Sequence, residues 1–273
     1  MPGPTRAGRK RAAAIPGQAM TNPTPLLSLR GIGKAYGPVV AVRDVDLDIF
    51  KGEVVALCGD NGAGKSSLIK VISGAEEATS GTISLRGRPV TFASPHDALE
   101  NGVATIYQAL ALAPRLSIAQ NVFMGSELTK PVLLPFLRIL DKKKMIAESQ
   151  RYLSQLSAAV TDMTRPVERL SGGQRQAVAI SRALRWNAEI IIMDEPTAAL
   201  GVKESALVLD LIRKLKADGK TVLLISHNMR DVVALADRVV IMGAGRKYVD
   251  QPLGDLTADD LSHMIMAGNA RAA

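Results

Sequence analysis

The nine residues Gly59-Asp60-Asn61-Gly62-Ala63-Gly64-Lys65-Ser66-Ser67 decide the fold of this chain. They have the spacing Gly-x4-Gly-Lys-[Ser/Thr] of a phosphate-binding loop. A triphosphate concentrates negative charge within a few ångströms, and glycines let successive backbone N–H groups curl around that charge. Lys65 adds a full positive charge near the β and γ phosphates, and Ser66 offers a hydroxyl to Mg²⁺. The stretch therefore predicts a nucleotide site.

The residues on either side of the loop fit this interpretation. Before it, Val54–Cys58 is a short apolar run suited to a buried parallel strand. After it, Ser67–Ile72 is compatible with a helix, and Gly74 is placed to end that helix. The alternative is a glycine-rich turn that merely joins a strand to a helix. The order of strand, loop and helix favours the nucleotide site.

The composition suits a protein with a large core and no membrane span. The chain has 273 residues, of which 47% are hydrophobic. No apolar run approaches the roughly 18 residues that cross a bilayer, and the closest stretch, 131–140, is broken by two prolines. We therefore expect a soluble or peripheral protein. Cys58 is the one cysteine, which excludes a disulfide within the chain and favours a small buried apolar residue.

The net charge of +8 raises the possibility of nucleic-acid binding, but its distribution weakens it. Half of the excess lies in residues 1–29, where Arg6, Arg9, Lys10 and Arg11 occur without any acid. We interpret residues 1–25 as a disordered basic tail. An inert tail is favoured over one that touches lipid or RNA, so no nucleic-acid partner is expected.

The rest of the chain contains alternating strands and helices. Val45, Leu47 and Ile49 alternate with aspartates, which predicts a half-exposed antiparallel strand. Further expected elements are a hairpin at 81–90, a mostly helical insert at 95–165, helices at 203–217 and 256–266, and strands at 190–193, 221–226 and 238–242.

Two isolated polar residues are candidates whose role the sequence alone leaves open. Tyr36 lies in the glycine-rich segment Lys34-Ala35-Tyr36-Gly37. It is equally suited to stacking on adenine and to packing its own turn. Gln108 follows the apolar stretch Val103–Tyr107, where a glutamine is usually an ordinary solvated residue.

Leu170-Ser171-Gly172-Gly173-Gln174 is a second candidate for anion binding. Ser171 is placed to cap the helix that follows, and the glycines leave backbone N–H groups approachable at its N-terminus. A simple helix cap accounts for the serine but not for two successive glycines and a glutamine.

Carboxylates and a histidine follow two apolar strands. Asp194 and Glu195 come directly after Ile190–Met193, and His227 follows Thr221–Ser226. Carboxyl ends of parallel strands share one edge of a sheet, which is where ligands of α/β proteins bind. Asp194 suits Mg²⁺, Glu195 suits a base that activates water, and His227 suits a donor to the γ-phosphate or an orienter of water.

Taken together, these motifs make the chain resemble an ATP-binding cassette (ABC) transporter subunit over about residues 26–250. Tyr36 matches the adenine-stacking aromatic of that family and 59–67 its Walker A loop, which implies ATP and Mg²⁺ as ligands. Gln108 matches the Q-loop, which the family uses in catalysis and metal binding. The pentapeptide 170–174 matches the signature motif without a substitution. Asp194 with Glu195 matches Walker B and the catalytic base, and His227 matches the switch histidine.

The resemblance also implies partners. In this family two subunits close head to tail, and the signature motif of each subunit caps the nucleotide bound by the other. One Walker A loop and one signature motif imply a homodimer, or a pair with a similar subunit, at the cytoplasmic face of the plasma membrane. An integral permease is the expected partner, and a periplasmic sugar-binding protein acts upstream.

The stretch 106–125 and the triplet Ala198-Ala199-Leu200 resemble the monosaccharide importers for ribose, xylose and fructose. The resemblance therefore implies an ATPase that drives sugar uptake, with an exporter cassette or a soluble, non-transport ATPase as the alternatives. One departure is Gly201, which stands where the D-loop of the family usually has aspartate. This puts in doubt any contact between subunits that the aspartate would make.

The expected architecture is a single α/β domain over residues 26–262, with a P-loop NTPase core, an antiparallel β-subdomain and a helical signature subdomain at roughly 95–185. Residues 263–273 are expected to form a tail.

Overall fold

Strand β3 (Val54–Gly59), which leads into the glycine-rich loop, lies inside a six-stranded sheet of order β12-β11-β3-β10-β9-β6. The computed structural model describes residues 24–132 and 137–270. The other strands of this sheet are β6 (Val103–Ile106), β9 (Ile190–Asp194), β10 (Thr221–Ile225), β11 (Arg238–Gly243) and β12 (Arg246–Pro252). β12 runs antiparallel to β11, and the other neighbouring pairs are parallel. The apolar runs predicted as buried strands are confirmed, and their carboxyl ends meet at one edge.

A second, antiparallel sheet covers one side of this core. Its strands are β1 (Leu27–Tyr36), β2 (Val39–Ile49), β4 (Ser80–Leu85) and β5 (Arg88–Val90), in the order β2-β1-β4-β5. The predicted strand through Val45 and the predicted hairpin at 81–90 are both confirmed. Helix α1 (Lys65–Ile72), which follows the loop, packs its apolar side into the same core as this sheet.

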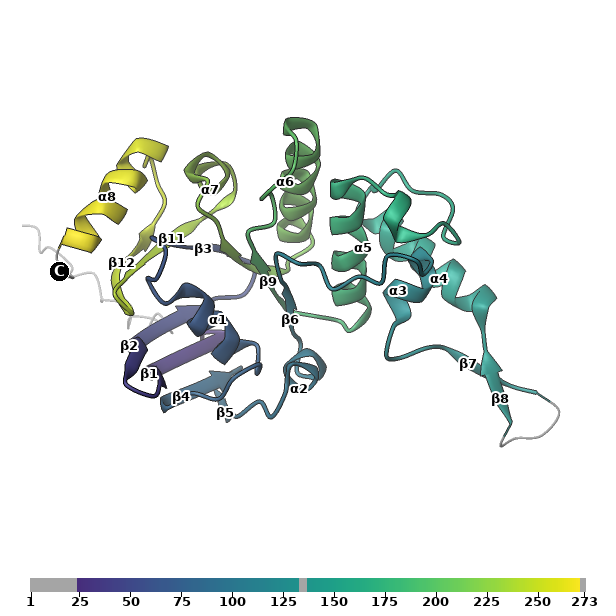
Figure 1. Ribbon diagram of the computed structural model, residues 1–273, viewed down its shortest axis with the longest axis horizontal. Coiled ribbons are helices and arrows are strands. Elements are labelled where there is room, and N and C mark those ends of the chain that lie inside the picture. The colour runs from purple at the N-terminus through teal and green to yellow at the C-terminus, as the bar shows by residue number, and fades with distance from the viewer. Residues whose placement is uncertain (1–23, 133–136, 271–273) are drawn as a thin grey trace, which may run out of the picture.

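The two faces of β3 belong to different cores because successive side chains of a strand point to opposite faces. Val55 and Leu57 pack with α1 and the antiparallel sheet. Val54, Ala56 and Cys58 pack on the other face, which is covered by helices (Figure 1). These helices are α5 (Gly172–Arg185), α6 (Val202–Ala217), α7 (Met229–Leu235) and α8 (Ala258–Ala270). The expected α/β P-loop fold with an antiparallel β-subdomain is confirmed, and Cys58 is buried as expected.

The segment 95–185, predicted as a mostly helical subdomain, contains strands as well as helices. Its elements are α2 (Pro95–Glu100), α3 (Ile118–Phe123), α4 (Lys142–Gln155), the 3₁₀ turn η1 (Val167–Arg169) and α5, but also β6 and a hairpin of β7 (Thr129–Pro131) and β8 (Arg138–Leu140). β6 belongs to the large sheet because its apolar residues pair in parallel with β9. The hairpin escaped prediction because it is short, contains proline and lacks a clear alternation of polar and apolar residues.

The predicted C-terminal boundary at residue 262 falls inside α8, the helix that the sequence predicts at 256–266. Helix α8 runs to Ala270 instead of giving way to a tail. Leu261 is fully buried, and Met264 and Ile265 pack partly against the same core, so the apolar spacing carries the helix onward. At the other end, Leu26 is buried, as expected for the start of the ordered domain, whereas residues 1–23 of the predicted tail lie outside the described residues. Among the described residues, no helix is long and apolar enough to cross a membrane.

Candidate nucleotide site

The loop at 59–67 has a backbone that requires glycine at defined positions. Gly59 and Gly64 adopt positive φ angles of +147° and +96°, a region that residues with a side chain rarely occupy. A Cβ atom at Gly59 would lie 2.3 Å from the carbonyl oxygen of Met242, and one at Gly64 would lie 2.3 Å from that of Ala41. The backbone thus turns tightly against the ends of neighbouring strands, as a phosphate cradle requires.

Lys65 places its charge over this loop. Its Nζ donates to the carbonyl oxygens of Gly59 at 2.8 Å and Asp60 at 3.0 Å. The N–H of Ala63 donates to the oxygen of Asp60 at 3.1 Å, which closes the turn. Asn61, Gly62 and Ser66 are exposed, whereas Ala63 is buried and Gly64 and Ser67 are half-buried. The loop therefore presents donors and a cation to solvent at the N-terminus of α1, where an anion binds most favourably.

Glu195 and His227, from different strand ends, are brought together at the same edge. The Oε2 atom of Glu195 lies 2.6 Å from Nδ1 of His227. Glu195 has a φ of +52°, a conformation that non-glycine residues hold at a cost and that clusters at functional sites. Its backbone N–H donates to the carbonyl oxygen of Ile225 at 2.9 Å, which fixes the end of β9 to that of β10. The structure thus pairs a carboxylate with an imidazole beside the loop.

Asp194 is half-buried one residue earlier. Burial raises the pKa of its carboxyl, and the neighbouring charge of Glu195 raises it further, while Lys65 lowers it. Across the described part of the chain, its carboxylate has no hydrogen bond or ion pair, and no cluster of three His, Cys, Asp or Glu residues forms a ready-made metal site. An unpartnered carboxylate oxygen near a phosphate loop fits a Mg²⁺ ion that takes its other ligands from hydroxyl, amide, phosphate and water.

Gln108 shares a cleft with Glu195. The cleft has a volume of about 590 Å³ and also receives residues of the segment after β6, the start of α5 and the segment after β9. Its lining includes Gln108–Leu112, Gly172, Arg175, Gln176, Glu195 and Ala198–Leu200. Ser171 lies outside this lining and instead borders a separate pocket of about 330 Å³ between α5 and α6.

Ser171 caps α5, as the sequence predicts. Its hydroxyl accepts from the N–H of Gln174 at 3.3 Å, and the Gln174 side chain accepts from the N–H of Ser171 at 3.1 Å. Packing explains at least one of the two glycines, because a Cβ atom at Gly172 would lie 2.3 Å from a methyl carbon of Leu200. In Figure 1, α5 and α1 lie apart, with β9 and β6 between them.

Tyr36 ends β1 and contacts the segment that follows α1. Its hydroxyl donates to the carboxylate of Glu76, and Nζ of Lys34 lies 5.1 Å from the centre of its ring. Hydrogen bonds from Tyr36 and Lys70 lower the pKa of Glu76 to about 2. The tyrosine is thus anchored at its hydroxyl while 40% of its surface remains exposed.

Four further hydrogen bonds shape the site and were not predicted. Thr197 donates to the buried Asp231 at 2.7 Å, and the Gln176 side chain donates to the carbonyl oxygen of Pro196 at 2.9 Å. Both contacts fix the turn that carries Glu195. Glu204 accepts from the N–H of Gly172 at 2.9 Å and from that of Gly201 at 3.4 Å. The sequence signal for this contact is the spacing, because Glu204 stands three residues after Gly201, the cap of α6, where a glutamate commonly accepts a hydrogen bond from the backbone.

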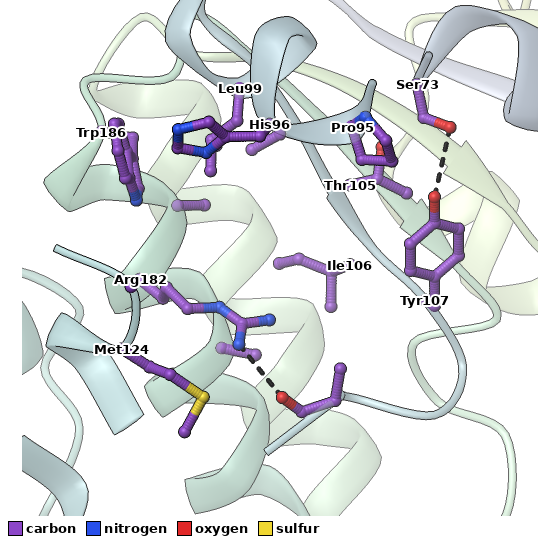
Figure 2. Close-up of a pocket in the computed structure, with 15 residues that line it drawn as sticks. Ser73, Pro95, His96, Leu99, Thr105, Ile106, Tyr107, Met124, Arg182 and Trp186 are labelled. Atoms are coloured by element: carbon purple, nitrogen blue, oxygen red, sulfur yellow. Dashed lines mark hydrogen bonds between the residues drawn. The ribbon is translucent and has the colours of Figure 1, made fainter. Parts of the chain in front are cut away.

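A third cavity, of about 350 Å³, lies between α2 with β6 and α3 with α5 (Figure 2). Figure 2 shows Trp186 beside His96 at one end, and the two rings meet edge to face at 5.2 Å. Arg182 reaches in from α5 and donates to the carbonyl oxygens of Ala111 at 3.1 Å and Leu110 at 3.4 Å. The segment after β6 therefore separates this cavity from the cleft that holds Glu195.

Comparison with known proteins agrees with this geometry. The ABC transporter family model matches residues 42–198. The fructose import ATP-binding protein FrcA of Rhizobium meliloti is 48% identical over 86% of this chain and 92% of its own length. The xylose/arabinose import ATP-binding protein XylG of Sulfolobus acidocaldarius is 48% identical over 88% of this chain and 93% of its own length. For the ribose import ATP-binding protein RbsA 2 of Escherichia coli O157:H7, 42% identical over 88% of this chain, the match spans 45% of that protein.

Solved structures show the same fold. A nucleotide-free ATP-binding cassette from an ABC transporter has a TM-score of 0.73 at 25% identity and covers 89% of this chain and 95% of its own. The dimeric post-hydrolysis state of the cassette MJ0796, bound to ADP and Pi, has a TM-score of 0.69 at 25% identity and covers 84% of this chain and all of its own.

Proposed function

The chain belongs to the ABC transporter family, and on this premise we propose that it is the ATP-hydrolysing subunit of a monosaccharide importer. The observation that carries the hydrolytic part is the pair of Glu195 and His227, 2.6 Å apart at the sheet edge where the loop of Lys65 also lies. The likeness to fructose, xylose/arabinose and ribose import proteins supports uptake of a sugar over the exporter and non-transport alternatives.

In this proposal ATP lies on the loop at 59–67, with its adenine against Tyr36 and its phosphates near Lys65. Ser66, Gln108 and Asp194 would hold Mg²⁺, which spreads the negative charge of the phosphates. Glu195 accepts the proton of the attacking water, and His227 orients that water and holds the base in place. The left-handed backbone of Glu195 and its N–H bond to β10 keep the carboxylate at the edge of the sheet.

We further propose that Ser171–Gln174 binds the nucleotide of a second subunit rather than that of its own chain. The separation of α5 from α1 in Figure 1 supports this arrangement, as does the position of Ser171 outside the cleft of Glu195. A helix N-terminus with an exposed serine hydroxyl is suited to contact a γ-phosphate presented by a partner. The active unit is then a head-to-tail dimer.

The cavity of Figure 2 is the proposed docking site for the permease. Its lining is largely apolar, and Arg182 joins it to the segment that carries Gln108. A permease element seated there would push on this segment, whose other side faces Glu195. The subunit would then lie at the cytoplasmic face of the plasma membrane, with a periplasmic sugar-binding protein supplying the sugar.

The experiment that tests hydrolysis compares Glu195→Gln with the wild type and with Glu148→Gln, a half-buried glutamate on α4 that pairs with Arg151. We expect Glu195→Gln to bind ATP as well as the wild type but to lose turnover by at least about a hundredfold, since it lacks the base. Glu148→Gln should keep both properties. Near-normal hydrolysis by Glu195→Gln would remove the assignment.

Sugar import is tested separately, in a strain that lacks this chain. Uptake of labelled fructose, xylose and ribose should fall for at least one sugar and return when the wild-type gene is restored. Co-purification of the tagged chain with an integral permease would support the transport role. Unchanged uptake of all three sugars, together with absence of a permease, would favour a non-transport ATPase.

A further inference from the structure

The hairpin of β7 and β8 is a two-stranded sheet that projects from the body of the molecule (Figure 1). It is held by its own bonds, because the N–H of Val132 donates to the carbonyl oxygen of Leu137 at 2.9 Å and the N–H of Asp141 to that of Leu128 at 2.7 Å. An isolated two-stranded hairpin is only marginally stable in water. The exposure and charge of its side chains therefore indicate what kind of surface the hairpin contacts.

The register places apolar side chains together on one face. Lys130 pairs with Ile139. Val132, two residues after Lys130, donates its N–H to the carbonyl oxygen of Leu137, two residues before Ile139. Because side chains alternate between faces, these four residues share one face of the hairpin. Val132, Leu137 and Ile139 are 48%, 51% and 48% exposed. We call these three residues the hairpin strip.

Cations surround the strip. Lys130 lies on the same face, and Lys142–Lys144 follow the hairpin directly, all of them exposed in the first turn of α4. Lysines at a helix N-terminus face the positive end of the helix dipole, so their position does not stabilise α4. Two acids lie near the hairpin in the chain, and both accept hydrogen bonds from the backbone. Asp141 caps α4, where it accepts from the N–H of Lys144 at 3.1 Å, and Glu127 accepts from the N–H of Gly125 at 3.1 Å. The surface therefore combines exposed apolar side chains with an excess of positive charge.

We propose that the hairpin strip and Lys130 lie in the headgroup region of an anionic lipid bilayer. Apolar side chains flanked by lysines bind such surfaces because burial of the apolar groups and attraction to anionic headgroups act together. This inference rests on the proposed function, which places the chain beside a membrane permease. Met124 and Gly125, which line the proposed permease cavity, precede β7 by only a few residues, so a short segment links the cavity to the hairpin.

The test uses the full purified chain and lipid vesicles without permease. Binding is measured by flotation with phosphatidylcholine vesicles and with vesicles that also contain about 30% phosphatidylglycerol. We expect binding to the anionic vesicles, a steep loss between about 0.05 and 0.5 M salt, and little binding to the neutral ones. Leu137→Ser combined with Ile139→Ser should weaken binding at least about tenfold, as should Lys130→Glu.

Matched controls change residues of the same kind elsewhere. Met266→Ser removes an exposed apolar side chain on α8, and Lys51→Glu reverses an exposed lysine before β3. Both should bind vesicles within about twofold of the wild type. Equal thermal unfolding and ATP binding among all variants would show that the hairpin changes spare the fold and that the proposed nucleotide site stands independently.

Three results would overturn the inference. The first is absence of vesicle binding by the wild type. The second is equal binding by wild type and hairpin variants, which would assign the attraction to other cations. The third is a set of hairpin variants that bind vesicles as the wild type does but no longer co-purify with a permease. That result would identify the permease as the partner of the hairpin strip.

Discussion

The hydrogen bonds of Glu204 allow the loss of stability in a Glu204→Ala variant to be estimated from the structure. Its carboxylate bonds to the N–H of Gly172 at 2.9 Å, at the start of α5, and to that of Gly201 at 3.4 Å, at the start of α6. The first is a short, charge-assisted bond, and the second is long and weak. A helix cap contributes about 1 kcal/mol, so Glu204→Ala should reduce the free energy of unfolding by about 1–2 kcal/mol.

For a chain of this size, that loss corresponds to a fall in Tm of roughly 2–4 °C. Glu204→Gln keeps an oxygen that accepts from Gly172, so its fall should be less than half as large. Asp141→Ala is the matched control, since it removes the cap of α4 at 3.1 Å without touching the signature motif.

Calorimetry and ATPase assays separate two roles of Glu204. If it positions the signature motif, Glu204→Ala should lower kcat several-fold with unchanged ATP affinity, whereas Asp141→Ala should lose stability alone. A change in Tm below about 1 °C for Glu204→Ala would refute the energetic reasoning. Equal kcat in both variants would refute the positioning role.

Three other predictions concern the nucleotide side of the fold. Tyr36→Phe should raise the pKa of Glu76 from about 2 towards its usual range, because a donor is lost, while ATP affinity stays constant; NMR titration measures the first and fluorescence the second, and an unmoved pKa would contradict the contact. Gly64→Ala should reduce ATP affinity more than about tenfold, because its Cβ would meet the carbonyl oxygen of Ala41; calorimetric binding tests this, and wild-type affinity would contradict it. Burial raises the pKa of the Cys58 thiol to about 12, so Ellman's reagent should react with it only after unfolding; rapid reaction of the native protein would contradict its burial.

The sequence predicted the edge of the large sheet well because several candidate residues stand at or just after the ends of apolar strands. Asp194 ends β9, Lys65 and His227 come soon after β3 and β10, and parallel pairing of these strands brings the three residues to one edge. Periodicity and turn residues carry this information locally.

The missed features depend on contacts between residues far apart in the chain. The bond from Gly172 to Glu204 spans 32 residues, and that from Thr197 to Asp231 spans 34. Similarly, β6 looks like part of a helical insert until it pairs with β9. The apolar spacing predicts a helix at 256–266, whereas its continuation to Ala270 follows packing of Met264 and Ile265 against the core.

The central claim is that each hydrolytic site combines Lys65 of one subunit with Ser171 of another, and a mixing experiment tests it most directly. Lys65→Ala and Ser171→Arg should each be inactive alone. A heterodimer of the two variants contains one site with both wild-type residues. Cooperative thermal unfolding of both variants checks that they are folded. Nucleotide binding is checked for Ser171→Arg, which keeps its own phosphate-binding loop. Mixing should restore ATPase activity to at most about a quarter of the wild-type level. If the mixture stays inactive although heterodimers form, the composite site is contradicted.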